Sequence, residues 1–115
     1  MTINKFEELI AWQRSKTLCV SVYKEFSISK DFGFNNQIQR ASVSIMNNIA
    51  EGFERRSNKE FRQFLYIAKG SCGEVRSMLH LAHELNKIDT KICTELNFLS
   101  QEISRIISGL IKTLN

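Results

Sequence analysis

Proline is absent from this chain of 115 residues, and glycine occurs only five times. These two residues most often end helices and shape turns, so their scarcity favours long helices over a turn-rich sandwich or barrel. Apolar residues make up 43% and charged residues 24% of the chain, which is typical of a packed globular domain. Because a chain of this length supports about one hydrophobic core, we expect residues 1–115 to form a single all-α domain.

Two helices are predicted in the first half of the chain. Asn4 and Glu7 have the spacing of a capping box, in which each side chain bonds the backbone N–H of the other residue. The first helix should therefore begin there and end near Phe26. Residues 27–33 mix serine, lysine, aspartate and glycine, a composition typical of turns. The second helix is then expected over residues 34–53.

Two further helices are predicted in the second half. Ser57 and Glu60 repeat the capping-box spacing, which places a break at residues 54–57 and begins the third helix there. Residues 86–90 form the last turn, in which Asp89 or Thr90 can cap the fourth helix. The fourth helix has apolar residues at alternating steps of four and three: Ile92, Leu96, Leu99, Ile103, Ile106, Leu110 and Leu114. Four helices joined by short loops predict an antiparallel up-down-up-down four-helix bundle.

The second and third predicted helices each have an unusual surface. On the second helix, a further apolar face adjoins the main one and consists of Val43, Met46, Ala50 and Phe53. We expect a second copy of the chain to cover this further face. The third helix contains Gly70 and Gly73 near its middle. Close approach of a neighbouring helix explains these glycines better than a phosphate-binding loop, because such a loop follows a strand.

A narrow polar stripe follows the second helix and has a candidate partner on the third. The stripe consists of Gln37, Arg40, Ser44, Asn48, Glu51 and Arg55. The candidate structural polar network consists of Gln37, Arg40, Ser44, Asn48 and Glu51 from this stripe, with Glu74 from the third helix. Because a buried charge is tolerated only when it is paired, we interpret the stripe as a hydrogen-bonded network in which Arg40 pairs with Glu51 or Glu74. The alternative is a binding pocket.

The basic residues are most concentrated at the expected corner between the second and third helices. The whole chain has a net charge of +4 and a pI of about 9.1. The corner cluster consists of Arg55, Arg56, Lys59 and Arg62, and is offset by Glu54 and Glu60. It is either a solvated corner or a patch that contacts the phosphates of RNA or DNA.

No pattern of catalytic residues stands out in the sequence. His80 and His83 lie one turn apart and supply two metal ligands, whereas a structural zinc site needs four. We therefore expect no enzyme activity, no metal, no cofactor and no small-molecule substrate. Three cysteines, Cys19, Cys72 and Cys93, are set among helical apolar residues and are expected to be reduced core thiols.

The sequence also lacks the signals of secretion and membrane insertion. Residues 1–8 carry charge and no apolar stretch of the kind found in signal peptides. No apolar run approaches the roughly 20 residues that a membrane-spanning helix needs. We expect a cytoplasmic protein with no membrane partner.

Residues 37–52 closely resemble bacterial four-helix bundle proteins known as 23S ribosomal-RNA intervening-sequence proteins. The sequence of this segment is Gln-Ile-Gln-Arg-Ala-Ser-Val-Ser-Ile-Met-Asn-Asn-Ile-Ala-Glu-Gly. Residues 61–65 and 67–74 extend the resemblance, and residues 6–13 resemble the first helix of that family. The resemblance implies a ring-like homopentamer and supplies no catalytic residues.

The same family resembles the accessory bundle protein of diversity-generating retroelements, which works with a reverse transcriptase and nucleic acid. This analogy favours nucleic-acid binding. Two hypotheses therefore remain open: an oligomeric basic adaptor that binds RNA or DNA, and a protein-binding scaffold whose charge is incidental.

Overall fold

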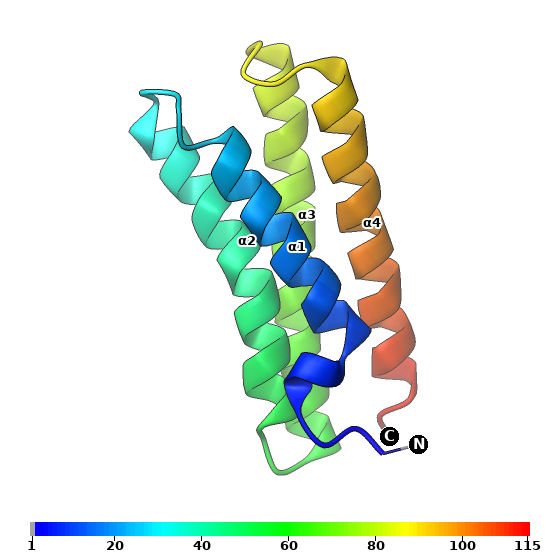
Figure 1. Ribbon diagram of the computed structural model, residues 1–115. Helices are drawn as coiled ribbons and strands as arrows, with labels where there is room; N and C mark the ends of the chain where they lie inside the picture. Colours follow the sequence, from blue (N-terminus) through cyan, green and yellow to red (C-terminus); the bar gives the residue numbers. More distant parts are fainter. Residues whose placement is uncertain (1) are drawn as a thin grey trace.

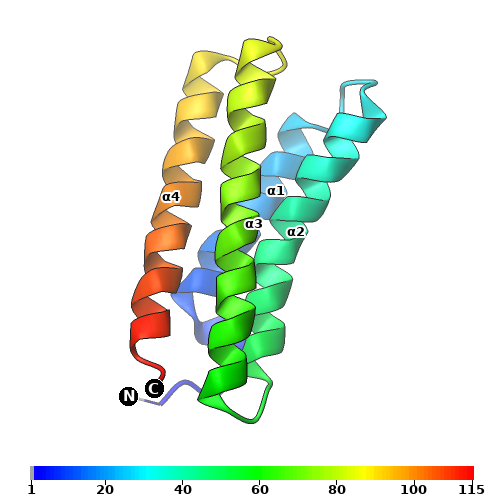
Figure 2. The same ribbon diagram turned by 180° about the vertical axis from the view of Figure 1, so that it is seen from behind.

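The computed structural model describes residues 2–115 and forms an elongated bundle that measures 43 × 22 × 19 Å (Figure 1). A 3-10 turn at Phe6–Glu8 precedes α1 at Ile10–Glu25, and α2, α3 and α4 span Phe32–Phe53, Asn58–Glu84 and Thr90–Lys112. Successive helices run in opposite directions, so both ends of the chain lie at the same end of the bundle (Figures 1 and 2). The predicted all-α, antiparallel four-helix bundle is confirmed.

The core runs along the bundle axis and takes side chains from every helix. Its largest fully buried residues include Leu18, Phe26, Ile38, Ile45, Ile49, Leu65, Leu79, Ile103 and Ile107. They recur at helical spacing, and each buried Leu or Ile side chain contributes about 1.5–3 kcal/mol to folding. The apolar pattern predicted for the fourth helix is confirmed, because all seven of its residues are buried or pack against the core.

The start of the first helix differs from the prediction. Asn4 and Glu7 form no capping box; the backbone N–H of Asn4 instead donates to Glu8 Oε1 at 2.9 Å. Leu9 has an extended backbone, with φ −76° and ψ 126°, so α1 begins only at Ile10. This break buries Leu9 and sets the ring of Phe6 against Trp12, with centroids 5.2 Å apart. Tertiary packing of these apolar side chains outweighs the local capping signal.

Side-chain caps define the starts of the other three helices. Asp31 accepts from the N–H of Phe34, so α2 begins two residues before the predicted position. Ser57 accepts from the N–H of Glu60, which is one half of the predicted capping box, but Glu60 Oε2 accepts from the Ser57 hydroxyl and not from its backbone N–H. Of the two candidates for the fourth helix, Asp89 is the cap and accepts from the N–H of Ile92 at 2.8 Å.

The prediction that a neighbouring helix packs closely against the glycines of the third helix is wrong. A Cβ atom placed on Gly70 or Gly73 would meet no atom within 4 Å, because both residues face away from the bundle. The close approach occurs instead at Gly52 on α2, where a Cβ would lie 2.7 Å from Phe64 Cβ and 2.9 Å from Phe61 Cδ1. Gly52 is therefore the glycine that α2 and α3 require for contact.

Candidate nucleic-acid interface

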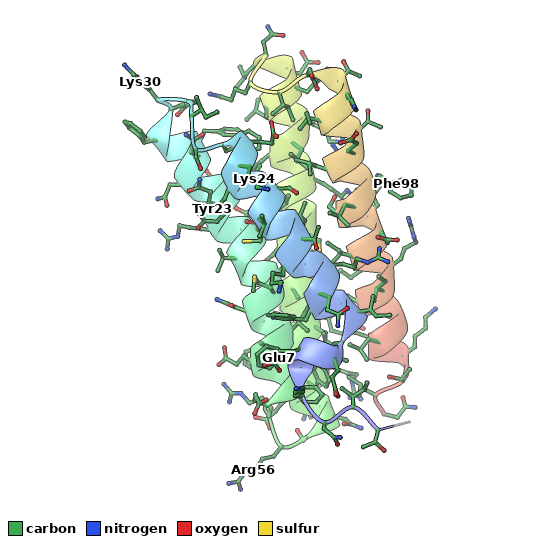
Figure 3. All side chains as sticks on the ribbon, viewed as in Figure 1. Glu7, Tyr23, Lys24, Lys30, Arg56 and Phe98 are labelled. Atoms are coloured by element: carbon green, nitrogen blue, oxygen red, sulfur yellow. The ribbon has the colours of Figure 1, made fainter. Side chains whose placement is uncertain are left out.

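The predicted basic corner lies at the turn between α2 and α3, at the end of the bundle where Arg56 projects into solvent (Figure 3). Ser57 caps α3 at this turn and so fixes where the helix begins. Arg56 and Lys59 are exposed. Among residues 2–115 neither lies within ion-pair distance of a carboxylate.

The two other cations of the corner are held by contacts within the chain. Arg55 donates to Glu51 Oε1 at 2.8 Å, lies 3.9 Å from Glu60 Oε1, and sits over the ring of Phe64 at 4.7 Å. Arg62 is half-buried and donates to the carbonyl of Leu114. The structure brings all four residues to one corner. Within residues 2–115, Arg56 and Lys59 are the two that form no ion pair and are exposed.

Part of the predicted polar stripe forms a network between α2 and α3. The hydroxyls of Ser44 and Ser71 lie 2.9 Å apart. Asn48 Nδ2 donates to the carbonyl and the hydroxyl of Ser44 at 2.8 and 3.0 Å. All three residues are half-buried. Ser71 belongs to this network although only its neighbour Glu74 was predicted from α3.

The other residues of the candidate network do not join these hydrogen bonds. Gln37, Arg40 and Glu74 are exposed and line an open hollow of about 420 Å³ between α2 and α3. The expected pairing of Arg40 is wrong for the chain as described in residues 2–115: Arg40 lies within ion-pair distance of no carboxylate, and Glu51 pairs with Arg55. Because the stripe follows the outer edge of α2, water can solvate these charges and no pairing is required.

A second set of basic side chains, not identified from the sequence, lies where α3 faces α4. Lys69 Nζ donates to Ser104 Oγ at 2.7 Å, and His83 Nε2 lies 3.0 Å from Thr90 Oγ1. Arg62 reaches the carbonyl of Leu114 from the same side of α3. The available signal was the seven-residue spacing of Arg62, Lys69, Arg76 and His83, which places them on one helix face.

The three thiols lie in the core of the bundle. All three cysteines are free and buried, as predicted. Burial raises the pKa of the Cys72 thiol to about 12, and the nearby charges of Lys69 and Arg76 offset only part of this effect. Within residues 2–115, no three His, Cys, Asp or Glu side chains gather as a possible metal site.

None of the described helices has both the length and the hydrophobicity needed to cross a membrane.

Comparisons with known proteins support the resemblance seen in the sequence. A solved structure of a protein with unknown function from the S23 ribosomal protein family of Bacteroides thetaiotaomicron matches with a TM-score of 0.85 and 25% identity, covering 90% of this chain and 99% of that one. Comparison with curated proteins gives no match. The family model described as 23S rRNA-intervening sequence protein matches residues 7–109, and the protein therefore belongs to the 23S rRNA-intervening sequence protein family.

Proposed function

We propose that this protein is a non-enzymatic nucleic-acid-binding adaptor that works as a homo-oligomer in the cytoplasm. The observation that carries the proposal is the shortage of partners for its cations. Of 16 lysine and arginine residues, only Arg14, Arg55 and Lys87 lie within ion-pair distance of a carboxylate in residues 2–115. Cations without intramolecular partners are available to the phosphates of a polyanion.

The corner of Arg56 and Lys59 is one proposed point of phosphate contact. Long side chains at a helix corner can reach a phosphate backbone without fitting into a groove, so they support affinity and contribute little to sequence preference. The name of the family connects it with 23S rRNA intervening sequences, which agrees with an RNA partner. A ring of copies would repeat the corner and raise affinity through several simultaneous contacts.

Exposed apolar side chains support the proposed oligomer. Large apolar residues that are at least 40% exposed include Ile10, Val20, Tyr23, Ile28, Phe32, Tyr66, Ile67, Leu81, Leu85 and Phe98. On α2, the further apolar face of Val43, Met46, Ala50 and Phe53 is only half-buried by the bundle. Exposed apolar surface of this kind often marks contact between chains. We propose a pentamer, with α2 at or near the subunit contact.

The decisive experiment is a salt titration of binding to fluorescent RNA and DNA. We compare the wild type with the double variant Arg56→Ala, Lys59→Ala, and use Lys24→Ala, Lys30→Ala as the control. The control removes the same charge from the opposite end of the bundle (Figure 3). Each lost phosphate contact should flatten the slope of log affinity against log salt by about 0.9 on duplex DNA or 0.7 on a single strand.

The corner variant should therefore flatten the slope by about 1.4 to 1.8 per bound subunit, with the control unchanged. If no nucleic acid binds even at about 50 mM salt, the proposal fails and the protein-binding scaffold replaces it. Light scattering tests the oligomer separately. A species of 13.3 kDa at micromolar concentration would contradict it.

A further inference from the structure

Two rows of side chains follow the contact between α3 and α4. The first row is Arg62, Lys69, Arg76 and His83 on α3; all four are half-buried, and three of them hydrogen-bond to α4 residues or to Leu114 just beyond it. The second row, also at seven-residue spacing, is Lys91, Phe98, Arg105 and Lys112 on α4, and all four are exposed. We call these two rows together the cationic groove. Seven residues advance a helix by about 10.5 Å, so the rows extend for roughly 30 Å.

The antiparallel helices place the two rows side by side. The bond from Lys69 to Ser104 brings Arg105 level with Lys69, and the bond from Arg62 to the Leu114 carbonyl brings Lys112 close to Arg62. Figure 2 shows α3 and α4 running beside each other along the length of the bundle. The groove is therefore lined by cations from both helices.

The lysines and arginines of this groove form no close ion pairs within residues 2–115. Within residues 2–115, Arg62, Lys69, Arg76 and Arg105 all lie beyond ion-pair distance of any carboxylate. Glu102 pairs with Arg14 of α1, and Glu74 lines the hollow on the α2 side of α3. A concentration of unneutralised cations along a groove favours an extended polyanion over a single small anion.

In the half of the groove nearer the turn between α3 and α4 lies a hollow of about 290 Å³ with a different chemistry. Its lining residues are His80, Cys93, Thr94, Asn97, Phe98 and Gln101. The ring of Phe98 is 64% exposed at the outer side of α4 (Figure 3). An exposed aromatic ring beside amide and hydroxyl groups can stack on a nucleobase and bond its edge.

Asn97 supplies an independent sign of a missing ligand. This residue is 8% exposed, and its Nδ2 donates to the carbonyl of Cys93 at 3.0 Å. Its Oδ1 is buried and has no hydrogen-bond partner among the described residues, and neither has Arg76 Nε on the other side of the groove. Buried polar atoms are nearly always paired, so an unpaired acceptor at the edge of a hollow indicates a donor that is supplied from outside.

We propose that the cationic groove binds a single-stranded polynucleotide, with phosphates on the two cation rows and one unstacked base against Phe98, its amino group directed toward Asn97 Oδ1. This inference rests on the proposed function and identifies the form of the ligand. A duplex would offer the phosphates but hide the face of its bases. RNA and single-stranded DNA share the required chemistry, and the 2′-hydroxyl distinguishes them.

The test measures fluorescence anisotropy of labelled single-stranded RNA, single-stranded DNA and duplex of one sequence, over a series of salt concentrations. Phe98→Leu removes the stacking ring, with Phe32→Leu as its control because Phe32 is also exposed but lies at the start of α2. Lys69→Gln with Arg105→Gln removes two groove cations. Its matched control is Lys24→Gln with Lys30→Gln, because these two lysines lie in α1 and in the α1–α2 turn and not in α3 or α4.

We expect single strands to bind more tightly than duplex. Phe98→Leu should weaken single-strand binding about tenfold without changing the salt slope, because stacking carries no charge. The Lys69, Arg105 double variant should flatten the slope by about 1.4. A strand made only of uridine should bind less tightly than one made only of adenosine or cytidine, because uracil has no amino group. A preference for RNA or for DNA supports the proposal and identifies the source of the strand.

The failure of this proposal differs from the failure of the proposed function. If the wild type binds but Phe98→Leu and the Lys69, Arg105 variant bind equally well, the groove is not the site and nucleic-acid binding stands. Duplex binding equal to single-strand binding, with no effect of Phe98→Leu, would also overturn the groove. No binding at about 50 mM salt would overturn both. Phe98 is exposed, so Phe98→Leu tests the groove even if the charge variant does not fold.

Discussion

Helix α3 packs closely against α2 but meets α4 across a row of long cationic side chains. On the α2 side, Gly52 lets the backbone approach Phe64, and the hydroxyls of Ser44 and Ser71 lie 2.9 Å apart. On the α4 side, Lys69 reaches Ser104, and the unpaired atoms of Arg76 and Asn97 lie in the contact. A hollow lies beside each contact, of about 420 Å³ near Arg40 and of about 290 Å³ near Asn97. The contacts differ in their polar groups: the hydroxyls of Ser44 and Ser71 lie at hydrogen-bond distance, whereas Arg76 Nε and Asn97 Oδ1 are buried without a partner. A ligand is therefore expected on the side where buried polar groups are left unpaired.

The largest expected effect concerns Cys72, which lies on α3 beneath the cation row. Its pKa of about 12, against 9.0 for an ordinary thiol, lowers its thiolate fraction at neutral pH roughly a thousandfold. Iodoacetamide labelling read by mass spectrometry should therefore leave Cys72 unmodified in the folded protein and modify it in urea. Rapid labelling of the folded protein would show that water reaches the core from the α4 side.

The same thiol gives a direction for the pH dependence of stability. Well below pH 9 the thiol is neutral in both the folded and the unfolded chain, so it has no effect there. As the pH rises from about 9 toward 12, the unfolded thiol ionises first and the free energy of unfolding should fall. Urea titrations of the wild type and Cys72→Ala across this range isolate the contribution of this residue.

Gly52→Ala is the next largest change and tests the close side of the comparison. The added Cβ would lie 2.7 Å from Phe64 Cβ, and overpacking of this kind costs about 1–3 kcal/mol. We expect a lower free energy of unfolding, measured by urea denaturation, despite a gain of about 1 kcal/mol in helix propensity. Gly73→Ala is the control: it enters open space and should stabilise by about 0.5–1 kcal/mol. Equal effects of the two variants would contradict the assigned contact.

Arg76→Met tests the open side of α3. The variant keeps an unbranched apolar stem but removes a guanidinium whose Nε is buried without a partner. Removal of an unsatisfied buried group should raise the free energy of unfolding by about 1 kcal/mol, while single-strand binding weakens. Urea denaturation and anisotropy on the same preparation measure both effects. A loss of stability would show that the guanidinium has a partner, such as one on a second subunit.

Arg40→Ala is expected to have the smallest effect. Arg40 is exposed at the outer edge of the α2–α3 hollow, and substitutions at such positions change stability by less than about 0.5 kcal/mol. A thermal melt should therefore leave Tm nearly unchanged, and light scattering should give an unchanged mass. A drop of several kcal/mol in the free energy of unfolding would mean that another copy of the chain buries Arg40. Both sides of α3 would then contain buried cations.

Much of the fold could be predicted because its signals are local. Three of these signals depend on spacing along one helix. They are the cap of α3 at Ser57, the two cap candidates Asp89 and Thr90 for α4, and the apolar pattern from Ile92 to Leu114. The start of α1 could not be predicted in this way, because the packing of Leu9 and Phe6 decides it. For the candidate site, spacing located the corner of Arg55 and Arg56 but not which of its cations are already paired.

The sequence by itself determined four helices, their order and their approximate bounds, because helical periodicity, end caps and the absence of proline act over a few residues at a time. Only the tertiary structure decided that Gly52, and not Gly70 or Gly73, lies at a close contact, since this depends on which face meets a neighbour. It also decided that Arg40 faces solvent and that Lys69 faces α4. A charged residue occupies the same sequence position whether water, a carboxylate or another helix surrounds it. Its environment is fixed only when the helices pack.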